Sequence, residues 1–186
     1  MAMRATVPRY TLQDLDSFPD DGNRYELVDG ILLVTPAPLP PHDAVVMRLS
    51  SLLILHFGPR PVAAVSTNGV VEIAPNVHME PDVLVMPAWT RVPETWLEVR
   101  DWWLAVEVSG RGSRIYDRDH KRPAYLTAGV REFWRVDLKD RCVYVSTPER
   151  PDERREDARV TWTPPEGPAP FILDVNALFE GVHGDE

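Results

Sequence analysis

The chain has 186 residues, 44% of them hydrophobic, and this composition predicts one globular domain with a sizeable core rather than a disordered chain. The net charge of −9 is unusual for a protein that binds nucleic acid over a wide surface, because affinity for DNA comes mainly from Lys and Arg. No apolar run approaches the roughly 20 residues of a membrane span. The first residues lack the apolar segment of a signal peptide. Cys142 is the single cysteine, so we expect a cytoplasmic protein without a disulfide and without a membrane contact.

The N-terminal part predicts a short helix followed by a β-hairpin. Thr11 has the side chain of a helix cap, and the helix should end before Pro19. Apolar and polar residues alternate over 24–28 and 31–35, around the turn Asp29-Gly30. An Asp-Gly pair between two alternating segments is a strong hairpin signal. We therefore expect a hairpin near the N-terminus.

The next segment predicts a long helix and a second hairpin. After a proline-rich connector at 36–41, apolar residues recur with helical spacing from His42 to Phe57. The strands expected at 62–66 and 70–73 flank Thr67-Asn68-Gly69, which predicts that they pair with each other.

The second half of the chain predicts mainly strands. In order, we expect strands after Asp82 and up to Val108, a helix from Pro123 to Ala128, strands at 131–137 and 141–146, a mobile loop at 148–159, a strand ending at Trp162 and a helix capped by Asp174. With no linker of domain size, the whole chain 1–186 forms a single domain with a core from about residue 10 to about residue 180. The order of elements is typical of an α/β protein (mixed α+β) with a central mixed sheet flanked by helices.

Two carboxylates and a lysine in the middle of the chain suggest a metal site. Pro81-Asp82 precedes the apolar run 83–86, Glu107 lies within the apolar run 104–108, and Lys121 follows in a basic segment. Carboxylates are hard oxygen ligands for Mg²⁺, and an ammonium group can orient a water or stabilise charge on a phosphate. The residues also allow a plainer interpretation, in which Asp82 bonds a local turn and Glu107 lies at a strand end or beside a cation.

The segment 111–122 carries a local excess of positive charge. Lys121 and four arginines stand against Asp117 and Asp119, which gives 5 − 2 = +3. The four arginines are candidates for phosphate binding: Arg111, Arg114, Arg118 and Arg122. A solvated helix end with locally paired charges explains the pattern equally well.

Four tryptophans cluster between the two carboxylate strands: Trp89, Trp96, Trp102 and Trp103. Base stacking and core packing are both open, and for Trp102 and Trp103 we favour the core. For the insert as a whole a homodimer interface over residues 88–103 is the preferred interpretation, because Trp is enriched at interface centres.

Across most of its length the chain resembles the Uma-two-type restriction endonuclease family, a branch of the PD-(D/E)XK nuclease superfamily. The matching pieces are Tyr25-Glu26-Leu27-Val28-Asp29-Gly30, His42, Pro81-Asp82, Val106-Glu107-Val108-Ser109, Tyr116-Asp117-Arg118, Lys121, Tyr125, Gly129-Val130 and 132–137. The resemblance implies a restriction-endonuclease-like core. One departure is that the superfamily's usual lysine position is Ser109 here. The resemblance assigns the role of this lysine to the next segment of the chain, where it falls to Lys121.

The resemblance also implies roles for individual residues. Asp82 and Glu107 would hold Mg²⁺ or Mn²⁺, with Glu26 as a further metal candidate, while His42 and Asp117 would be accessory groups. The sequence has no glycine-rich phosphate loop, so we expect no nucleotide cofactor. Two functions follow as hypotheses: a Mg²⁺-dependent endonuclease acting on DNA, and a catalytically silent nuclease-fold protein that binds nucleic acid or a protein partner.

Overall fold

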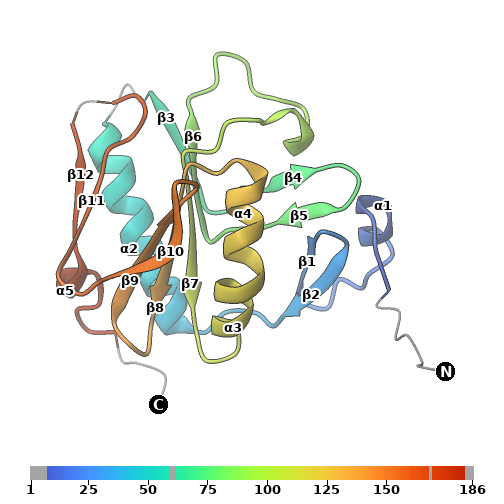
Figure 1. Cartoon of the computed structure of the whole chain (residues 1–186), viewed down its shortest axis with the longest axis horizontal. Coiled ribbons are helices and arrows are strands. Elements are labelled where there is room, and N and C mark those ends of the chain that lie inside the picture. Colours follow the sequence, from blue (N-terminus) through green and yellow to red (C-terminus); the bar gives the residue numbers. More distant parts are fainter. Residues whose placement is uncertain (1–7, 59–61, 168, 183–186) are drawn as a thin grey trace.

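The computed structural model describes residues 8–58, 62–167 and 169–182, and its centre is a six-stranded sheet (Figure 1). The strand order is β10-β9-β8-β7-β6-β3. The strands are β3 Ala63–Ser66, β6 Val83–Pro87, β7 Leu104–Ser109, β8 Glu132–Asp137, β9 Cys142–Thr147 and β10 Arg150–Glu156. Only the pair β7–β8 is parallel, and the other neighbours are antiparallel. The predicted mixed central sheet is therefore present.

The parallel pair requires a crossover, and this crossover is helical. It consists of α3 Arg114–Tyr116, a π-helical turn η2 Asp117–Lys121 and α4 Arg122–Ala128, and it ends at Gly129 with φ 100°. The helix predicted to begin at Pro123 thus begins earlier. Pro123 lies directly after the π turn, as the second residue of α4.

The N-terminal hairpin belongs to a second, smaller sheet of order β2-β1-β5-β4. Its strands are β1 Arg24–Val28, β2 Ile31–Thr35, β4 Val71–Ile73 and β5 Val77–Met79. The prediction of this hairpin is confirmed, because β1 pairs with β2 in register and Asp29 and Gly30 both have positive φ in the turn. A type I′ hairpin turn requires that conformation.

The predicted second hairpin is wrong. β3 pairs with β6, and β4 pairs instead with β5, a strand that the sequence pattern did not indicate. Gly69 is needed for a different reason than a hairpin turn, since a Cβ there would lie 2.7 Å from the Leu84 side chain. Close packing of the backbone on β6 explains the glycine.

The remaining elements pack around the two sheets described so far. They are α1 Leu12–Leu15, α2 Pro40–Phe57, η1 Trp96–Glu98, β11 Arg159–Trp162, β12 Phe171–Asp174 and α5 Val175–Leu178. The short helix at residue 12 and the cap by Asp174, whose side chain accepts from the Ala177 N–H, are confirmed. The predicted loop at 148–159 is instead occupied largely by β10, which forms one edge of the sheet and contains a bulge between Arg150 and Arg154.

Two cores lie on opposite faces of the central sheet. On one face α2, α5 and the β11–β12 pair pack against β-strand residues such as Val83, Val106 and Trp134. On the other face α4 and the smaller sheet pack against Leu84, Ala105 and their neighbours. Figure 1 shows this arrangement, with α2 and α4 on opposite sides of the central strands.

The tryptophans of the insert divide between core and surface. Trp102 and Trp103 are buried, one in each core, which agrees with the core interpretation for that pair. Trp89 packs edge-on against Trp96 and is partly exposed. The homodimer interface over residues 88–103 stays a prediction. Within the described residues, no helix has the length and apolar character needed to span a bilayer.

Candidate active site

Asp82 and Glu107 project from neighbouring strands onto the same face of the central sheet. In the β6–β7 pair Val83 lies opposite Val106 and Leu84 opposite Ala105. Extending that register by one residue puts Asp82 opposite Glu107. Because side chains alternate along a strand, both carboxylates fall on the face that also carries Leu84 and Ala105, the face covered by α4. Residues directly opposite in an antiparallel pair have Cβ atoms about 5 Å apart.

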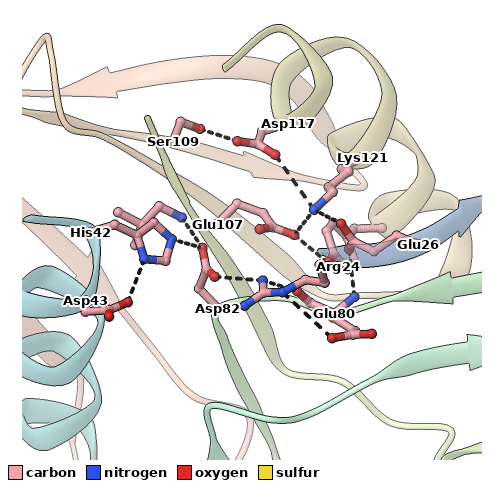
Figure 2. A network of polar contacts seen from close by, with 12 residues as sticks. Arg24, Glu26, His42, Asp43, Glu80, Asp82, Glu107, Ser109, Asp117 and Lys121 are labelled. Atoms are coloured by element: carbon pink, nitrogen blue, oxygen red, sulfur yellow. Dashed lines mark hydrogen bonds and ion pairs between the residues drawn. The ribbon is translucent and has the colours of Figure 1, made fainter. Parts of the chain in front are cut away.

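Asp82 is buried and is held by three donors (Figure 2). Arg24 Nη1 donates to Oδ1 at 3.0 Å, the Val108 N–H donates to Oδ2 at 2.8 Å, and His42 Nε2 lies 3.0 Å from Oδ2. Burial opposes ionisation, but His42, Arg24 and the amide together outweigh it and lower the pKa of Asp82. Burial also opposes the charge on His42, but Asp82 raises its pKa overall. Asp82 is therefore ionised at neutral pH.

Lys121 is buried in a cage of carboxylates. Its Nζ lies 2.5 Å from Glu26 Oε2, 3.3 Å from Glu107 Oε1 and 3.9 Å from Asp117 Oδ1. The three acids raise the pKa of Lys121 against the effect of burial, so the ammonium stays charged. Glu26 also accepts the Glu80 N–H through Oε1 at 2.8 Å. Both oxygens of Glu26 thus contact protein donors.

The crossover presents one side to Glu107. Asp117, Lys121 and Tyr125 are spaced four residues apart, and all three are buried. Tyr125 donates from its hydroxyl to Glu107 Oε1 at 2.6 Å and stacks on Phe133. Asp117 accepts from the Ser109 hydroxyl at 2.7 Å. The π turn widens the helix between the first two of these residues, a distortion that is frequent at functional sites.

The two facing carboxylates differ in their affinity for protons. Burial is the main cause that raises the pKa of Glu107 well above its ordinary value, and the charges of Asp82, Asp117 and Glu26 add to it against the pull of Lys121. The pKa of Asp82, in contrast, is lowered. Two neighbouring acids whose pKa values are shifted in opposite directions are typical of catalytic sites, so this pair is a candidate for catalysis.

These groups line an open cleft of about 670 Å³. Its lining includes Asp82, Glu107, Asp117, Lys121, Arg24 and His42, so every catalytic or accessory residue predicted from the sequence except Glu26 borders one space. Glu26 reaches the site through Lys121. The rest of the lining comes mainly from the end of β2, the proline-rich connector at 36–41 and the loop at 110–113.

The four arginines proposed as phosphate ligands are engaged with the protein itself. Arg114 bonds Asp137 at 2.6 Å and Arg118 bonds Asp119 at 2.7 Å. Arg122 donates to the Pro151 carbonyl, and Arg111 borders the cleft. Arg114 and Arg118 show the local charge pairing that the sequence allowed as an alternative, and the role of the four arginines in phosphate binding stays a prediction.

The chemistry of the donors suits a hard divalent cation. Four buried carboxylates gather near Lys121, and Asp117 Oδ1 is buried without a hydrogen bond. In the described part of the chain, no three His, Cys, Asp or Glu side chains are gathered closely enough to form a complete metal shell. Mg²⁺ does not need one, because it is usually held by one or two carboxylates together with water and substrate phosphate.

Sequence reasoning missed two groups of this site. Arg24 directly precedes the family piece that begins at Tyr25 but is not part of it, and nothing in the pattern indicates its contact with Asp82. Tyr125 appeared only as a matching residue of the family, although its spacing of four residues from Lys121 would have placed both on one side of a helix.

Comparisons with known proteins agree with this architecture. The family model for Uma2, described as "Putative restriction endonuclease", matches residues 12–176. A crystal structure from Anabaena variabilis, described as a "putative nuclease belonging to DUF820", superposes with a TM-score of 0.71 at 16% identity. The alignment covers 93% of this chain and 99% of that one. No curated protein matches. The structural likeness establishes a nuclease-like fold, which confirms the predicted fold class.

Proposed function

Because the chain belongs to the Uma-two-type family of restriction endonucleases, we propose that it is a metal-dependent endonuclease that hydrolyses phosphodiester bonds in DNA. The observation that carries the proposal is the position of Asp82 and Glu107 opposite each other on neighbouring strands, beside a buried ammonium group and in the lining of an open cleft. A scaffold without chemistry has little reason to bury two acids opposite each other, since each costs desolvation energy.

In this proposal Asp82 and Glu107 hold Mg²⁺ or Mn²⁺. A bound divalent cation supplies a water of lowered pKa and neutralises charge on the phosphate. The donors already present suggest which oxygens take part. Tyr125 and Lys121 both contact Oε1 of Glu107, so Oε2 would face the ion. Arg24 is the single donor described at Oδ1 of Asp82, against two at Oδ2, so Oδ1 keeps more acceptor capacity.

The remaining residues act as positioning groups or as fixed charges. Lys121 supplies a permanent positive charge beside the attacking water or the phosphate, and such a charge stabilises the transition state more than the ground state. Glu26 holds the ammonium in place from the opposite side, and we propose this role for it instead of metal ligation. His42 and Arg24 fix the orientation of Asp82.

A nuclease assay tests the proposal directly. With Mg²⁺ or Mn²⁺ the purified protein should nick or cut DNA, and EDTA should stop the reaction. Glu107→Gln keeps the shape of the side chain but removes a charged ligand, so cutting should cease. Glu94→Gln is the matched control, because Glu94 is an exposed residue of the insert, outside the cleft, and this variant should cut like wild type.

Two results would reject hydrolysis. Equal activity of wild type and Glu107→Gln would identify a contaminating nuclease. Binding of DNA without cleavage under either metal would favour the second hypothesis, a catalytically silent binding protein with a nuclease fold.

A further inference from the structure

The rim of the candidate active-site cleft carries several exposed apolar side chains. Val34, Leu39 and Tyr116 border the cleft, and their exposed fractions are 49%, 63% and 45%. Pro36, Pro38 and Pro41 continue the same wall. Large apolar side chains that remain exposed around one pocket indicate a ligand with an apolar surface of its own.

The charges of the cleft do not favour a long polyanion. Three permanently charged cations line it, Arg24, Arg111 and Lys121, against the three carboxylates Asp82, Glu107 and Asp117. Arg24 and Lys121 are bound to carboxylates of the site. Outside the cleft, Arg114 and Arg118 are paired with Asp137 and Asp119. Among the described residues that line the cleft, these three Lys and Arg side chains are fewer than the roughly 6–10 phosphate contacts that a protein holding a duplex can make.

The nature of the ligand follows from which surfaces of DNA are accessible. In a duplex the faces of the bases are stacked inside, and the outside presents phosphates and base edges. An unpaired nucleotide presents a base face and a phosphodiester together, and apolar or aromatic side chains stack on such faces without sequence preference. A cleft of about 670 Å³ lies within the usual range for small-ligand pockets, about 300–1,000 Å³, so it has room for a nucleotide and its neighbouring phosphate.

We infer that the cleft takes an unpaired segment of a DNA strand, with a base against the wall formed by Val34, Leu39 and Tyr116 and its phosphate directed to Asp82 and Glu107. This inference rests on the proposed function for the direction of the phosphate. The preference for an unpaired strand rests separately on the apolar rim and the balance of charges, and it applies to binding as well as to cutting.

Binding measurements separate the inference from the proposed function. Fluorescence anisotropy would compare a labelled single-stranded oligonucleotide with the same sequence in a blunt hairpin duplex, using the Glu107→Gln protein at one fixed salt concentration. We expect at least about tenfold tighter binding of the single strand, because stacking on the rim is available only to unpaired bases.

Two substitutions of equal charge locate the site. Leu39→Glu adds a carboxylate to the rim and should weaken single-strand binding about tenfold. Leu55→Glu makes the same chemical change at an exposed position of α2 that does not border the cleft, where Leu55 is 76% exposed. It should change binding less than about twofold, because exposed charges at a distance are screened by salt.

The outcomes are distinct. Equal or tighter binding of the duplex, equal effects of the two leucine variants, or no binding of either DNA would overturn the inference. Cleavage of duplex DNA with no cleavage of single strands would also overturn it while supporting the proposed function. Single-strand binding that depends on Leu39, in a protein that cuts no DNA, would support the inference and reject the proposed hydrolysis.

Discussion

The two faces of the central sheet are built from the same strands and differ in what those strands bury. Toward α2, residues such as Val83, Val106 and Val136 form a continuous apolar core. Toward α4, the alternate positions of the same strands carry buried polar side chains: Asp82, Glu107, Ser109, Arg135, Asp137 and Ser146. Most of these lie at one end of the strands, beyond Leu84 and Ala105 of the second core.

This difference shows that one face of a sheet can stabilise the fold while the other face carries the candidate active site. The α2 face supplies apolar burial, which stabilises a fold by about 25 cal/mol per Å². The α4 face carries charges whose burial is unfavourable unless each is paired. A neighbouring network, in which Arg135 bonds both Asp137 and Glu153, continues the polar zone beside the Lys121 cage. The following substitutions test how separate the two faces are.

The largest effect should come from placing a charge on the apolar face. Val106→Asp would bury a carboxylate among apolar neighbours with no cation near it, at a cost of about 5 kcal/mol or more, which unfolds most domains. The adjacent Glu107→Gln should leave the free energy of unfolding unchanged or raise it, because it removes an acid whose pKa is already raised by burial. Denaturant unfolding of both variants is the measurement. Equal losses of unfolding free energy in the two variants would show that the two faces tolerate a change of charge equally.

Removal of the central cation should have the next largest effect. Lys121→Met leaves Glu26, Glu107 and Asp117 buried without their shared partner, and breaking a buried ion pair from one side typically costs about 3–5 kcal/mol. The double variant Lys121→Met, Glu26→Gln should recover part of that loss. A double variant that is as unstable as the sum of two single losses would mean that Lys121 and Glu26 do not act as a pair.

A smaller effect is expected from Tyr125→Phe. The ring keeps its stacking on Phe133, and only the hydrogen bond to Glu107 Oε1 is lost. Bonds to charged groups contribute about 1.5–3 kcal/mol, and a less fixed Glu107 should bind Mg²⁺ more weakly, measured by titration calorimetry. Tyr144→Phe serves as the control, since that hydroxyl contacts Arg155 outside the cleft. Equal Mg²⁺ affinities in both variants would exclude a positioning role for Tyr125.

The smallest effect concerns pH. The folded-state pKa of Glu107 lies above its unfolded value. Its contribution to stability is therefore complete at acid pH, below the unfolded pKa, and is lost as pH rises through the folded pKa. Mg²⁺ binds the deprotonated acid, so it should stabilise the protein more at pH 8 than at pH 5.5.

At ten times its Kd, Mg²⁺ would add about 1.4 kcal/mol, a rise in Tm of about 3–6 °C. Thermal unfolding with Mg²⁺ and with EDTA at both pH values measures the difference, and Glu107→Gln should remove it. An equal rise in Tm at both pH values would contradict the assignment of Glu107 as the titrating ligand.

Local patterns predicted some elements of this fold well and others poorly. The Asp29-Gly30 turn and the capping of the last helix by Asp174 depend on neighbouring residues, and both are confirmed. The pairing of β3 with β6 depends on residues about twenty positions apart, so a local turn signal at Asn68-Gly69 gave the wrong partner. The polar, heavily charged sequence of β10 concealed a strand because sheet pairing overrides weak propensity.

The residues of the candidate site also differ in how well the sequence predicted them. Asp82, Glu107 and Lys121 were found because they stand in or beside recognisable strand and family patterns, and they border one cleft. Arg24 could not be found, since its contact with Asp82 joins two different sheets. Arg114 and Arg118 pair with nearby acids. A count of charges along the sequence could not predict this pairing, because it does not show where the side chains point.

The edge strand β10 limits how this protein can associate with itself. An exposed strand edge is a template for unwanted pairing with another chain. Here the edge carries Pro151, which has no N–H, a bulge between Arg150 and Arg154, and charged side chains along most of its length. These are the features that prevent sheets from joining into aggregates and fibres. Growth of the sheet from molecule to molecule through β10 is therefore disfavoured, and any self-association of this sheet by strand pairing would have to use its other edge, β3.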